Sequence, residues 1–419
     1  MGTMATRSTL PLDEIDLSSL DFWNAGEEHR EAGFATLRRE APVRFFQEVE
    51  IPGWPTGPGY WGLTRYDDIV DASRRPELFC SGRGTNIADL PIEIAEFFGS
   101  MINMDDPRHA RLRNIVQKGF TPRMVARVEG YVRDKAIRLV DRALEEHPDG
   151  QCDFVQTFAA QLPLQIICEM MGIPAEDEAQ IFAWTNTILG AGDPEYGGSF
   201  ETLMAASVEM NQYAQALGED RRANPRDDIT SALMHAEVEG ERLTSQEFGS
   251  FFILLVVAGN ETTRNAISHG MKALTDHPDQ RRAWWDDFEA LSRSAVEEIV
   301  RWATPVIHFR RTATADTEIR GMPIREGDKV VYWYNSANRD EDHFTDPHRF
   351  DIRRYPNSHL GFGAGGPHFC LGASLARREI SVMFDEIRSR LPSLEVTAEP
   401  SMLQSYFIHG IKSMPCAWR

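Results

Sequence analysis

Cysteine is scarce in this chain, and no Cys-x-x-Cys pair occurs. The cysteines are Cys80, Cys152, Cys168, Cys370 and Cys416. An odd number of widely spaced cysteines does not make a disulfide framework and is typical of a protein from a reducing compartment. We therefore expect a cytoplasmic location.

Long hydrophobic runs are also absent. The longest, Phe251–Ala258, has eight residues, whereas a helix needs about 20 to cross a bilayer. Residues 1–17 lack the continuous apolar core of a signal peptide. These two absences predict that the protein has no membrane anchor and no secretion signal.

Positive charge is in deficit, because 44 Lys and Arg face 64 Asp and Glu, for a net charge of −20. A protein of this charge is repelled by nucleic-acid phosphates, so we expect no nucleic-acid partner. Apolar residues make up 42% of the 419 residues. A chain of this size and composition can bury a core that encloses a large prosthetic group.

The hydrophobic pattern divides the chain into strand-like and helical stretches with no linker between them. Residues 43–70, 304–335 and 395–419 are rich in aromatic and β-branched residues interrupted by Pro and Gly, which predicts small sheets. Residues 105–302 and 371–391 have apolar residues at three- and four-residue spacing, which predicts helices. The expected fold class is mainly α with small β-sheets (α+β), in a single domain over residues 1–419.

The most distinctive predicted helix begins at Thr244, where Thr-Ser-Gln-Glu forms a capping box, and ends before His277. A helix of this length extends about 50 Å. Its middle, Phe251–Ala258, is apolar on all sides, so we expect it to lie in the core.

Polar residues follow directly after this apolar middle. Gly259 costs about 1 kcal/mol relative to alanine in a helix interior, and Glu261 and Thr262 need polar partners if they are buried. The Thr262 hydroxyl can open the backbone ladder into a groove, and Glu261 beside it can pass protons from solvent. The alternative is a helix packed closely at Gly259, with Glu261 on a solvated face.

A glycine-rich loop with one cysteine precedes the last long helix, because residues 361–372 read GFGAGGPHFCLG. Its glycines let the backbone fold tightly beneath the Cys370 sulfur, and the N-terminus of the following helix favours a thiolate. A thiolate is a metal ligand or a nucleophile. The alternative for a lone cysteine is a small buried side chain that happens to precede a helix.

Two other interpretations of this loop are weaker. Gly361, Gly363 and Gly366 satisfy the G-x-G-x-x-G dinucleotide pattern, but no strand precedes them and the helix opens at the cysteine. His368 and Cys370 suggest zinc, yet no second pair of ligands occurs at a suitable spacing.

Two charged motifs lie elsewhere in the helical stretches. Glu298 and Arg301 form a possible ion pair three residues apart, which is ordinary on a helix. His109 and Arg113 lie four apart after Pro107, so both donors share one helix face. They could bind a carboxylate or phosphate group, and the alternative is a solvated basic face.

Taken together, these motifs resemble those of cytochromes P450, the haem-thiolate monooxygenases, from about residue 20 to the end. The cysteine loop of that family, Phe-x-x-Gly-x-x-x-Cys-x-Gly, is matched by Phe362, Gly365, Cys370 and Gly372. The long-helix motif, Ala/Gly-Gly-x-Asp/Glu-Thr, is matched by residues 258–262. The resemblance implies the cytochrome P450 fold, with haem b (iron protoporphyrin IX) between a long distal helix and the helix after the cysteine loop.

The resemblance also implies a role for each matched residue. Cys370 is expected to be the iron ligand, and Glu261 and Thr262 to deliver the protons that oxygen activation needs. The residues expected to bind the haem propionates are His109, Arg113, Arg311 and His368. Further haem contacts are expected from Phe362, Ala258 and Gly259. The expected brace of the cysteine loop consists of Glu298, Arg301 and either Arg349 or Arg354.

The soluble bacterial class that the chain resembles uses O2 and takes electrons from a ferredoxin and its ferredoxin reductase. Residues 108–123 contain five Lys or Arg and no acidic residue. In a chain of net charge −20, this local excess of positive charge is an expected docking patch for an acidic redox partner.

The stretches AGNETTRNAISHG and GAGGPHFCLGASLARREI are similar to those of the actinobacterial branch that oxidises sterol side chains and methyl-branched lipids. We expect an apolar substrate pocket lined by Leu254, Ala258, Val306 and Phe407. The expected reaction is therefore terminal (ω) hydroxylation of such a lipid. The alternatives are a tailoring hydroxylase of a bacterial polyketide or terpenoid, a haem-thiolate enzyme that uses peroxide, and a non-catalytic haem-based sensor.

Overall fold

The computed structural model describes residues 9–48, 56–89, 100–119, 122–190, 193–196, 199–237 and 240–419. Its helix-rich part consists of α5 (Arg108–Gly119), α6 (Pro122–Glu146), α7 (Gln161–Met171), α8 (Glu178–Leu189), α9 (Phe200–Ala223), α10 (Ile229–His235), α11 (Ser245–Asp276), α12 (Pro278–Asp286), α13 (Phe288–Ala303) and α15 (Ala373–Arg390). Most of the buried apolar side chains of these helices join in one large core.

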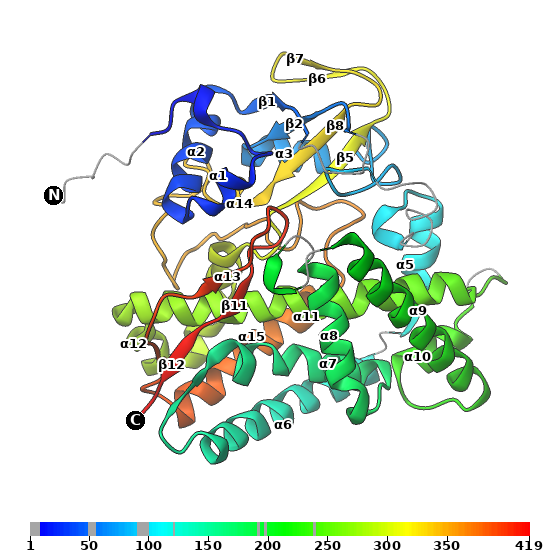
Figure 1. Ribbon diagram of the computed structural model, residues 1–419, viewed down its shortest axis with the longest axis vertical. Coiled ribbons are helices and arrows are strands. Elements are labelled where there is room, and N and C mark those ends of the chain that lie inside the picture. The colour runs from blue at the N-terminus through cyan, green and yellow to red at the C-terminus, as the bar shows by residue number, and fades with distance from the viewer. Residues whose placement is uncertain are drawn as a thin grey trace.

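The long helix α11 crosses the middle of this part (Figure 1). It packs against α7, α8, α9, α13 and α15. The predicted capping box is present: the Thr244 hydroxyl accepts a hydrogen bond from the Glu247 N–H at 3.1 Å, and the Glu247 carboxylate accepts one from the Thr244 N–H at 3.1 Å. In the apolar middle of α11, Phe251, Phe252, Ile253 and Val256 are buried in the core as predicted, whereas Ala258 is exposed.

A β-rich part lies against one end of the helices (Figure 1). Its main sheet has the strand order β1 (Val43–Phe46), β2 (Tyr60–Leu63), β8 (Lys329–Trp333), β5 (His308–Ala313), β3 (Phe79–Cys80). Strands β2 and β8 are parallel and the other neighbours are antiparallel. The short helices beside it are α1 (Leu20–Asn24), α2 (Glu27–Glu40), α3 (Tyr66–Ser73) and α14 (Tyr334–Ala337).

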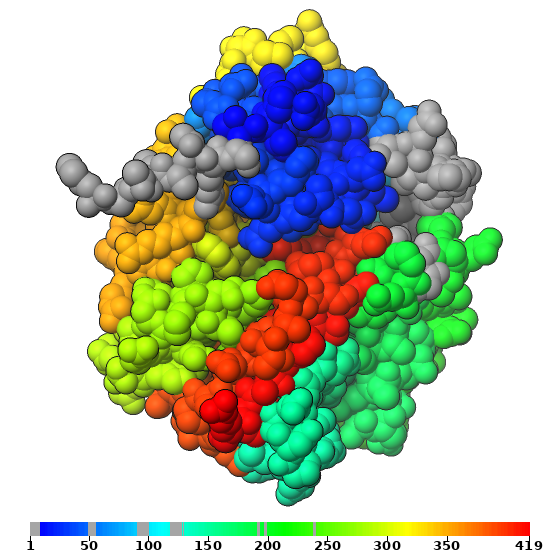
Figure 2. Space-filling view, turned by 60° about the vertical axis from the view of Figure 1, so that its left-hand side comes forward, coloured from blue at the N-terminus to red at the C-terminus, as the bar shows by residue number. Residues whose placement is uncertain are grey.

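The C-terminal segment joins the two parts. Figure 2 shows it running over the surface between the N-terminal residues and the helices around α6. Its strands are β9 (Glu395–Val396), β10 (Ser401–Met402), β11 (Ile411–Ser413) and β12 (Pro415–Ala417); β4 (Gln151–Asp153) pairs with β12, and β6 (Thr317–Ile319) pairs with β7 (Met322–Ile324). Between β10 and β11, Ile408 bridges back to Val306, so this hairpin reaches the start of β5.

The expected architecture, mainly α with small sheets, is confirmed, but three boundaries differ. Residues 66–70 were expected to be strand-like, yet they belong to α3, because Ile69 and Ala72 lie one helical turn apart and are buried together. The predicted strand-like stretch 304–335 ends in a helix, because α14 begins at Tyr334. The last long helix begins at Ala373, two residues later than expected, with Gly372 as its N-cap. Within the described ranges, every helix is too short or too polar to cross a bilayer.

Candidate active site

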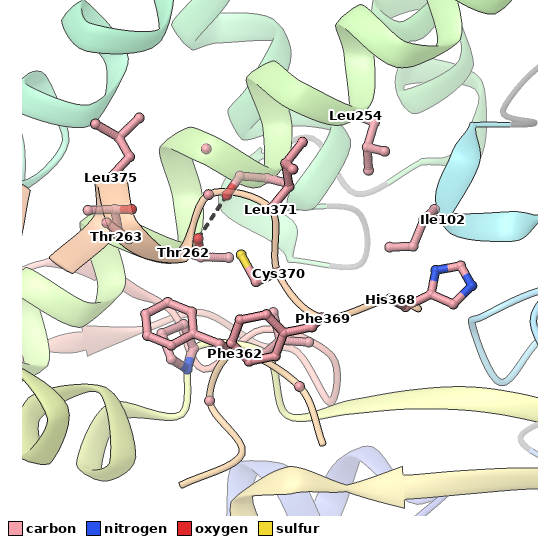
Figure 3. Close-up of a pocket in the computed structure, with 18 of the residues that line it drawn as sticks. Ile102, Leu254, Thr262, Thr263, Phe362, His368, Phe369, Cys370, Leu371 and Leu375 are labelled. Atoms are coloured by element: carbon pink, nitrogen blue, oxygen red, sulfur yellow. Dashed lines mark hydrogen bonds between the residues drawn. The ribbon is translucent and has the colours of Figure 1, made fainter. Parts of the chain in front are cut away.

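A pocket lies between the cysteine loop and the middle of α11 (Figure 3). The loop side of its wall contains Phe362, His368 and Cys370, and the α11 side contains Ala258 and Thr262. In the view of Figure 3 the Cys370 sulfur points toward the turn of α11 that carries Thr262. The two motifs that the sequence singled out therefore face one another across one pocket.

Glycines give the cysteine loop its shape. Gly363, Gly365 and Gly366 all adopt positive φ (98°, 89° and 77°), a region that other residues rarely enter. At Gly366 a side chain would also collide with the backbone carbonyl of Ser73. The Cys370 N–H donates to the Phe362 carbonyl at 3.0 Å and closes the turn. Loop geometry, rather than phosphate binding, thus explains these glycines.

The Cys370 side chain is exposed toward the pocket. The pocket walls shield it from bulk solvent, so desolvation raises the pKa of its thiol, while the Gly372 N–H and the charges of Arg113 and Arg377 act in the opposite direction. The Gly372 N–H, at the N-cap of α15, thus acts on the pKa in the direction that the sequence predicts, and desolvation is the larger effect. A metal cation at the sulfur would instead displace the proton.

A buried brace, defined here as Glu298, Arg301 and Arg354, supports the loop from α13. Arg301 donates two parallel hydrogen bonds to Glu298, each 2.8 Å long, and both side chains are 0% exposed. Arg301 also donates to the carbonyls of Asn338 (2.8 Å) and Pro347 (2.7 Å). A paired charge with all its donors satisfied is the form in which a charge is tolerated in a core.

The third member of the brace, which the sequence left open, is Arg354. Its Nε donates to Glu298 at 3.0 Å. Arg349 contributes its backbone carbonyl, which accepts from Arg354 at 2.8 Å, while its own side chain is exposed. The guanidinium of Arg349 is therefore outside the brace.

Four donors expected to bind an anionic group all line the pocket: His109, Arg113, Arg311 and His368. The rings of His109 and His368 lie 4.3 Å apart, and Arg113 donates to the Phe369 carbonyl at 2.8 Å. Burial, together with the neighbouring charges of Arg311, His109 and Arg113, lowers the pKa of His368 to about 3. The buried His109 Nε2 has no hydrogen-bond partner among the described residues. Such a set of donors suits a ligand that carries carboxylates.

Thr262 and its neighbours form the α11 wall. The Thr262 hydroxyl donates to the Ala258 carbonyl at 2.8 Å (Figure 3). A side chain at Gly259 would meet Ile167 at an ordinary 3.6 Å, so close helix packing does not require glycine there. The alternative of a tightly packed helix at Gly259 is wrong, and the small residue instead leaves a flat wall facing the pocket.

Glu261 lies on another face of α11. Its side chain is 1% exposed, does not line the pocket, and forms an ion pair with Arg264. Desolvation raises the pKa of Glu261, and the Arg264 charge opposes that rise. The alternative of Glu261 on a solvated face is therefore wrong. Arg264 was not singled out in the sequence, although its i,i+3 spacing from an acid in a buried helix was the available signal.

Comparison with known proteins agrees with this site. The cytochrome P450 family model matches residues 280–390. The methyl-branched lipid omega-hydroxylase of Mycobacterium tuberculosis is 57% identical over 409 residues, which cover 98% of this chain and 96% of that protein. This chain belongs to the cytochrome P450 family.

Other relatives of this cytochrome P450 have the same fold. The steroid C26-monooxygenase of Rhodococcus jostii is 43% identical over 90% of this chain and 80% of its own length. A Mycobacterium marinum cytochrome P450 solved with pseudoionone superposes with a TM-score of 0.91 at 43% identity, covering 98% of this chain and 100% of that one. The Bacillus subtilis cytochrome P450 of the bacillaene polyketide synthase has a TM-score of 0.82 at 33% identity, over 94% and 98%. The expected cytochrome P450 fold is confirmed.

Cytochromes P450 carry a haem, and the residues of this pocket fit one. An accessible thiol faces the pocket from one side, and small residues line the opposite wall. The unpartnered His109 Nε2 and the neighbouring arginines lie where acidic substituents need donors. Within the described ranges, no three His, Cys, Asp or Glu side chains gather to hold a metal ion, so His368 and Cys370 have no further zinc ligands.

A second buried acid, Glu379, also lines the pocket of this cytochrome P450 from α15. Desolvation raises its pKa to about 8, and its Oε2 has no partner among the described residues. The sequence contained a signal that was missed: Glu379 lies three residues after Ala376 and four before the buried Met383, on the inward face of the helix.

Three of the four residues predicted to contact the substrate line the pocket. Leu254, Ala258 and Val306 line the pocket, but Phe407 does not. The Phe407 ring packs behind Phe309, with the ring centres 5.6 Å apart, and Phe309 provides the lining instead. The prediction for Phe407 is therefore wrong, and its neighbour Phe309 takes the place on the wall. Further apolar lining comes from Met101, Ile102, Phe251 and Leu255.

The predicted basic docking patch is largely neutralised where the structure describes its side chains. Arg111 pairs with Glu247 at 2.5 Å and with Glu241 at 3.1 Å, and Arg108 lies 3.7 Å from Glu247. Arg113 points into the pocket. The side chains of Lys118 and Arg123 lie outside the described residues. These acidic partners, distant in sequence, could not be seen from the composition of residues 108–123.

Proposed function

We propose that this cytochrome P450 is a monooxygenase that hydroxylates the terminal carbon of a methyl-branched lipid or of a sterol side chain. The observation that carries the proposal is the pocket itself, in which Cys370 faces Thr262 and most of the remaining wall is apolar. The names of the two most relevant relatives, a methyl-branched lipid omega-hydroxylase and a steroid C26-monooxygenase, narrow the substrate class.

The overall reaction consumes the substrate, O2, two electrons and two protons, and it yields an alcohol and one water. Haem b, when bound, supplies the iron that activates O2. Cys370 would hold the iron as a thiolate. The residues that would bind the propionates are His109, Arg113, Arg311 and His368. The protons are held and moved by Glu261 and Thr262.

Terminal selectivity must come from the shape of the pocket, because internal methylene C–H bonds are weaker than those of a terminal methyl group. Leu254, Val306 and Phe309 line the same pocket as Thr262. Apolar side chains on several elements favour a long chain that enters end-on, with its terminus closest to the reacting centre.

The electrons would come from a ferredoxin reduced by its ferredoxin reductase, and the protein would work in the cytoplasm. The resemblance to bacterial relatives supports this source. The described basic side chains of residues 108–111 are paired with acids. The surface of this protein that binds the ferredoxin would therefore include other residues.

An absorption titration of the purified ferric protein tests the proposal. We expect a thiolate-type haem spectrum whose Soret band moves to shorter wavelength with a methyl-branched long-chain lipid or a sterol. Product analysis by mass spectrometry should then show the terminal alcohol. A response only to a macrolide would favour a tailoring hydroxylase, for which the similarity to the bacillaene cytochrome P450 is the supporting observation. A protein that binds no haem would overturn the proposal.

A further inference from the structure

Two cysteines that have no part in the haem site lie side by side in the small sheet near the C-terminus (Figure 1). Cys152 in β4 and Cys416 in β12 are directly opposite one another in the antiparallel register, although 264 residues separate them in the sequence. Their sulfur atoms are 3.5 Å apart and hydrogen-bonded, and both are free thiols. Neither side chain lines the pocket, so the pair needs an explanation other than haem binding.

Backbone hydrogen bonds fix the two strands on either side of the pair. The Phe154 N–H donates to the Met414 carbonyl at 2.9 Å. The Trp418 N–H donates to the Gly150 carbonyl at 2.9 Å. Each of these bonds lies two residues from the cysteines, so the cysteines form a pair of the hydrogen-bonded type, with Cα atoms about 5.5 Å apart. Disulfides span Cα separations of about 4.4 to 6.8 Å, so the strands already hold the two sulfurs within bonding reach.

The bond would be easy to break again. Opposite Cβ atoms in a sheet are about 4.5 to 5.5 Å apart, whereas those of a disulfide are about 3.8 Å apart. Closing the bond therefore draws the strands slightly together, and a disulfide formed under such strain is readily reduced by other thiols. A pair of this kind suits a reversible modification better than a permanent cross-link.

The surroundings make Cys152 the more reactive of the two thiols. Cys152 is half-buried, whereas Cys416 is only 2% exposed. The hydrogen bond with Cys416 is the largest effect on the pKa of Cys152 and lowers it, the Thr157 side chain lowers it further, and burial acts in the opposite direction. The charges of Asp153 and Asp149 also oppose the lowering. The same sulfur–sulfur hydrogen bond and burial raise the pKa of Cys416. Because the thiolate is the nucleophile, Cys152 is the sulfur that attacks.

Two other cysteines outside the haem site differ from this pair. Cys80 in β3 and Cys168 in α7 are both buried. Burial raises the pKa of both thiols. They therefore serve as internal comparisons for the reactivity of a single buried thiol.

We propose that Cys152 and Cys416 form a dithiol that hydrogen peroxide oxidises reversibly to a disulfide between β4 and β12. The Cys152 thiolate attacks one oxygen of hydrogen peroxide, the O–O bond breaks, and a sulfenic acid and hydroxide form. The hydroxide takes up the proton that Cys152 lost on ionisation and becomes water. The Cys416 sulfur then displaces hydroxide from the sulfenic sulfur, and its own proton joins that hydroxide as a second water. The two sulfurs lose two electrons in total, and these electrons reduce one peroxide to two waters.

The disulfide would join two segments that both lead to the pocket wall. From β4 the chain runs through residues 155–159 into α7, whose Ile167 and Met170 line the pocket. On the other side, β12 follows β11 and the residue Ile408, which bridges to the lining residue Val306. A cross-link between residues so far apart in sequence restricts the unfolded chain. Oxidation should therefore make this side of the molecule harder to unfold.

The test treats the haem-loaded wild-type protein with hydrogen peroxide, in the absence of lipid, and then alkylates the free thiols. We expect non-reducing peptide mapping by mass spectrometry to show a linked pair of peptides containing Cys152 and Cys416. Dithiothreitol should abolish the link, and Cys80 and Cys168 should remain alkylated thiols. The thermal unfolding midpoint of the oxidised protein should be about 3 °C above that of the reduced protein.

Serine variants test the order of the two steps. In Cys416→Ser the sulfenic acid on Cys152 meets no second thiol, so dimedone, which traps sulfenic acids, should label Cys152. In Cys152→Ser the buried Cys416 should remain an unlabelled thiol, and the unfolding midpoint should not rise with peroxide. The matched control is Cys168→Ser, which should keep both the cross-link and the rise in midpoint.

Several outcomes would overturn the proposal. Free thiols at both positions after peroxide treatment, a link between two copies of the chain, or sulfinic acid on Cys152 without a link would each do so. Dimedone on Cys416 in Cys152→Ser, with none on Cys152 in Cys416→Ser, would overturn the assigned order. A link without a higher midpoint would overturn the stabilising effect. Neither the oxidation nor its test needs the lipid or turnover, so each of these results is independent of the proposed hydroxylation.

Discussion

Buried charged groups are hydrogen-bonded to very different extents on the two sides of the pocket. On the cysteine-loop side, the brace satisfies its charges completely: Glu298 accepts from Arg301 and Arg354, and Arg301 also reaches two backbone carbonyls. On the α11 side, Glu261 and Arg264 are equally buried, yet several of their polar atoms have no hydrogen-bond partner among the described residues.

This difference in hydrogen bonding indicates that the two sides of the pocket have different functions. A metal ligand must stay at one position, and a saturated, hydrogen-bonded network gives it a rigid support. A proton relay must exchange partners during turnover, so it needs donors and acceptors that are not fully used. The sequence motifs around Cys370 and Thr262 therefore lie in surroundings of different stiffness.

The largest effect should come from substitution of Cys370, the expected iron ligand, whose loop the brace supports. In Cys370→Ala we expect loss of the thiolate-type spectrum of the reduced carbon monoxide complex and a fall in turnover by about three orders of magnitude or more. The matched control is Cys168→Ala, since Cys168 is buried in α7 away from the pocket. Normal carbon monoxide spectra and full turnover in Cys370→Ala would refute the ligand assignment.

The next largest effect concerns the brace itself. Arg301→Ala leaves the buried Glu298 carboxylate with Arg354 as its one ion-pair partner among the described residues and should lower the free energy of unfolding by about 3 to 5 kcal/mol. The double variant Arg301→Ala with Glu298→Gln should be less destabilised than the sum of the single variants, because the stranded charge is gone. Guanidinium unfolding with haem absorbance as the probe measures both, and strict additivity would show that the two side chains do not act as a unit.

Sequence reasoning found the residues whose spacing is short and regular. Cys370 lies in a dense glycine pattern, and Glu298 with Arg301 and Ala258 with Thr262 lie on single helices, where spacing fixes geometry. Arg349 and Arg354 could not be separated, because they lie in an irregular stretch without a period that assigns a side chain to one side.

Sequence reasoning could not identify contacts between residues that lie far apart in the chain. The direction of Phe407 depends on the bridge between Ile408 and Val306, two segments about one hundred residues apart. The acids that neutralise residues 108–111 come from the start of α11 and the segment before it. Pairing across such separations depends on how the helices pack, and a single sequence does not encode it in any local pattern.

Glu379 gives a smaller effect that depends on pH. Its folded-state pKa of about 8 exceeds the 4.5 of an exposed glutamate, so the unfolded state gives up its proton first as pH rises. The group therefore makes the protein less stable with rising pH, and the loss continues until about pH 8. Between pH 5 and pH 7 the loss is about 2 to 3 kcal/mol.

Glu379→Gln should remove this part of the pH dependence, measured as unfolding midpoints at pH 5, 6 and 7. Glu297→Gln is the control. Burial would raise the pKa of Glu297, but hydrogen bonds and charge from His359 and Arg377 outweigh it and lower the pKa to about 2. Its contribution therefore changes only between about pH 2 and 4.5 and should leave the slope above pH 5 unaltered. An unchanged slope in Glu379→Gln would show that this carboxyl is hydrated in the folded protein.

The smallest effect should come from substitution of Arg349, which tests whether the brace ends at Arg354. Its side chain is exposed and only its carbonyl joins the brace, so Arg349→Ala should change the free energy of unfolding by no more than about 0.5 kcal/mol. Arg354→Ala removes a charged hydrogen bond to Glu298 at 3.0 Å and should cost about 1.5 to 3 kcal/mol. Equal losses in the two variants would mean that both arginines share the third place, and the saturated network would then extend to the protein surface rather than end at Arg354.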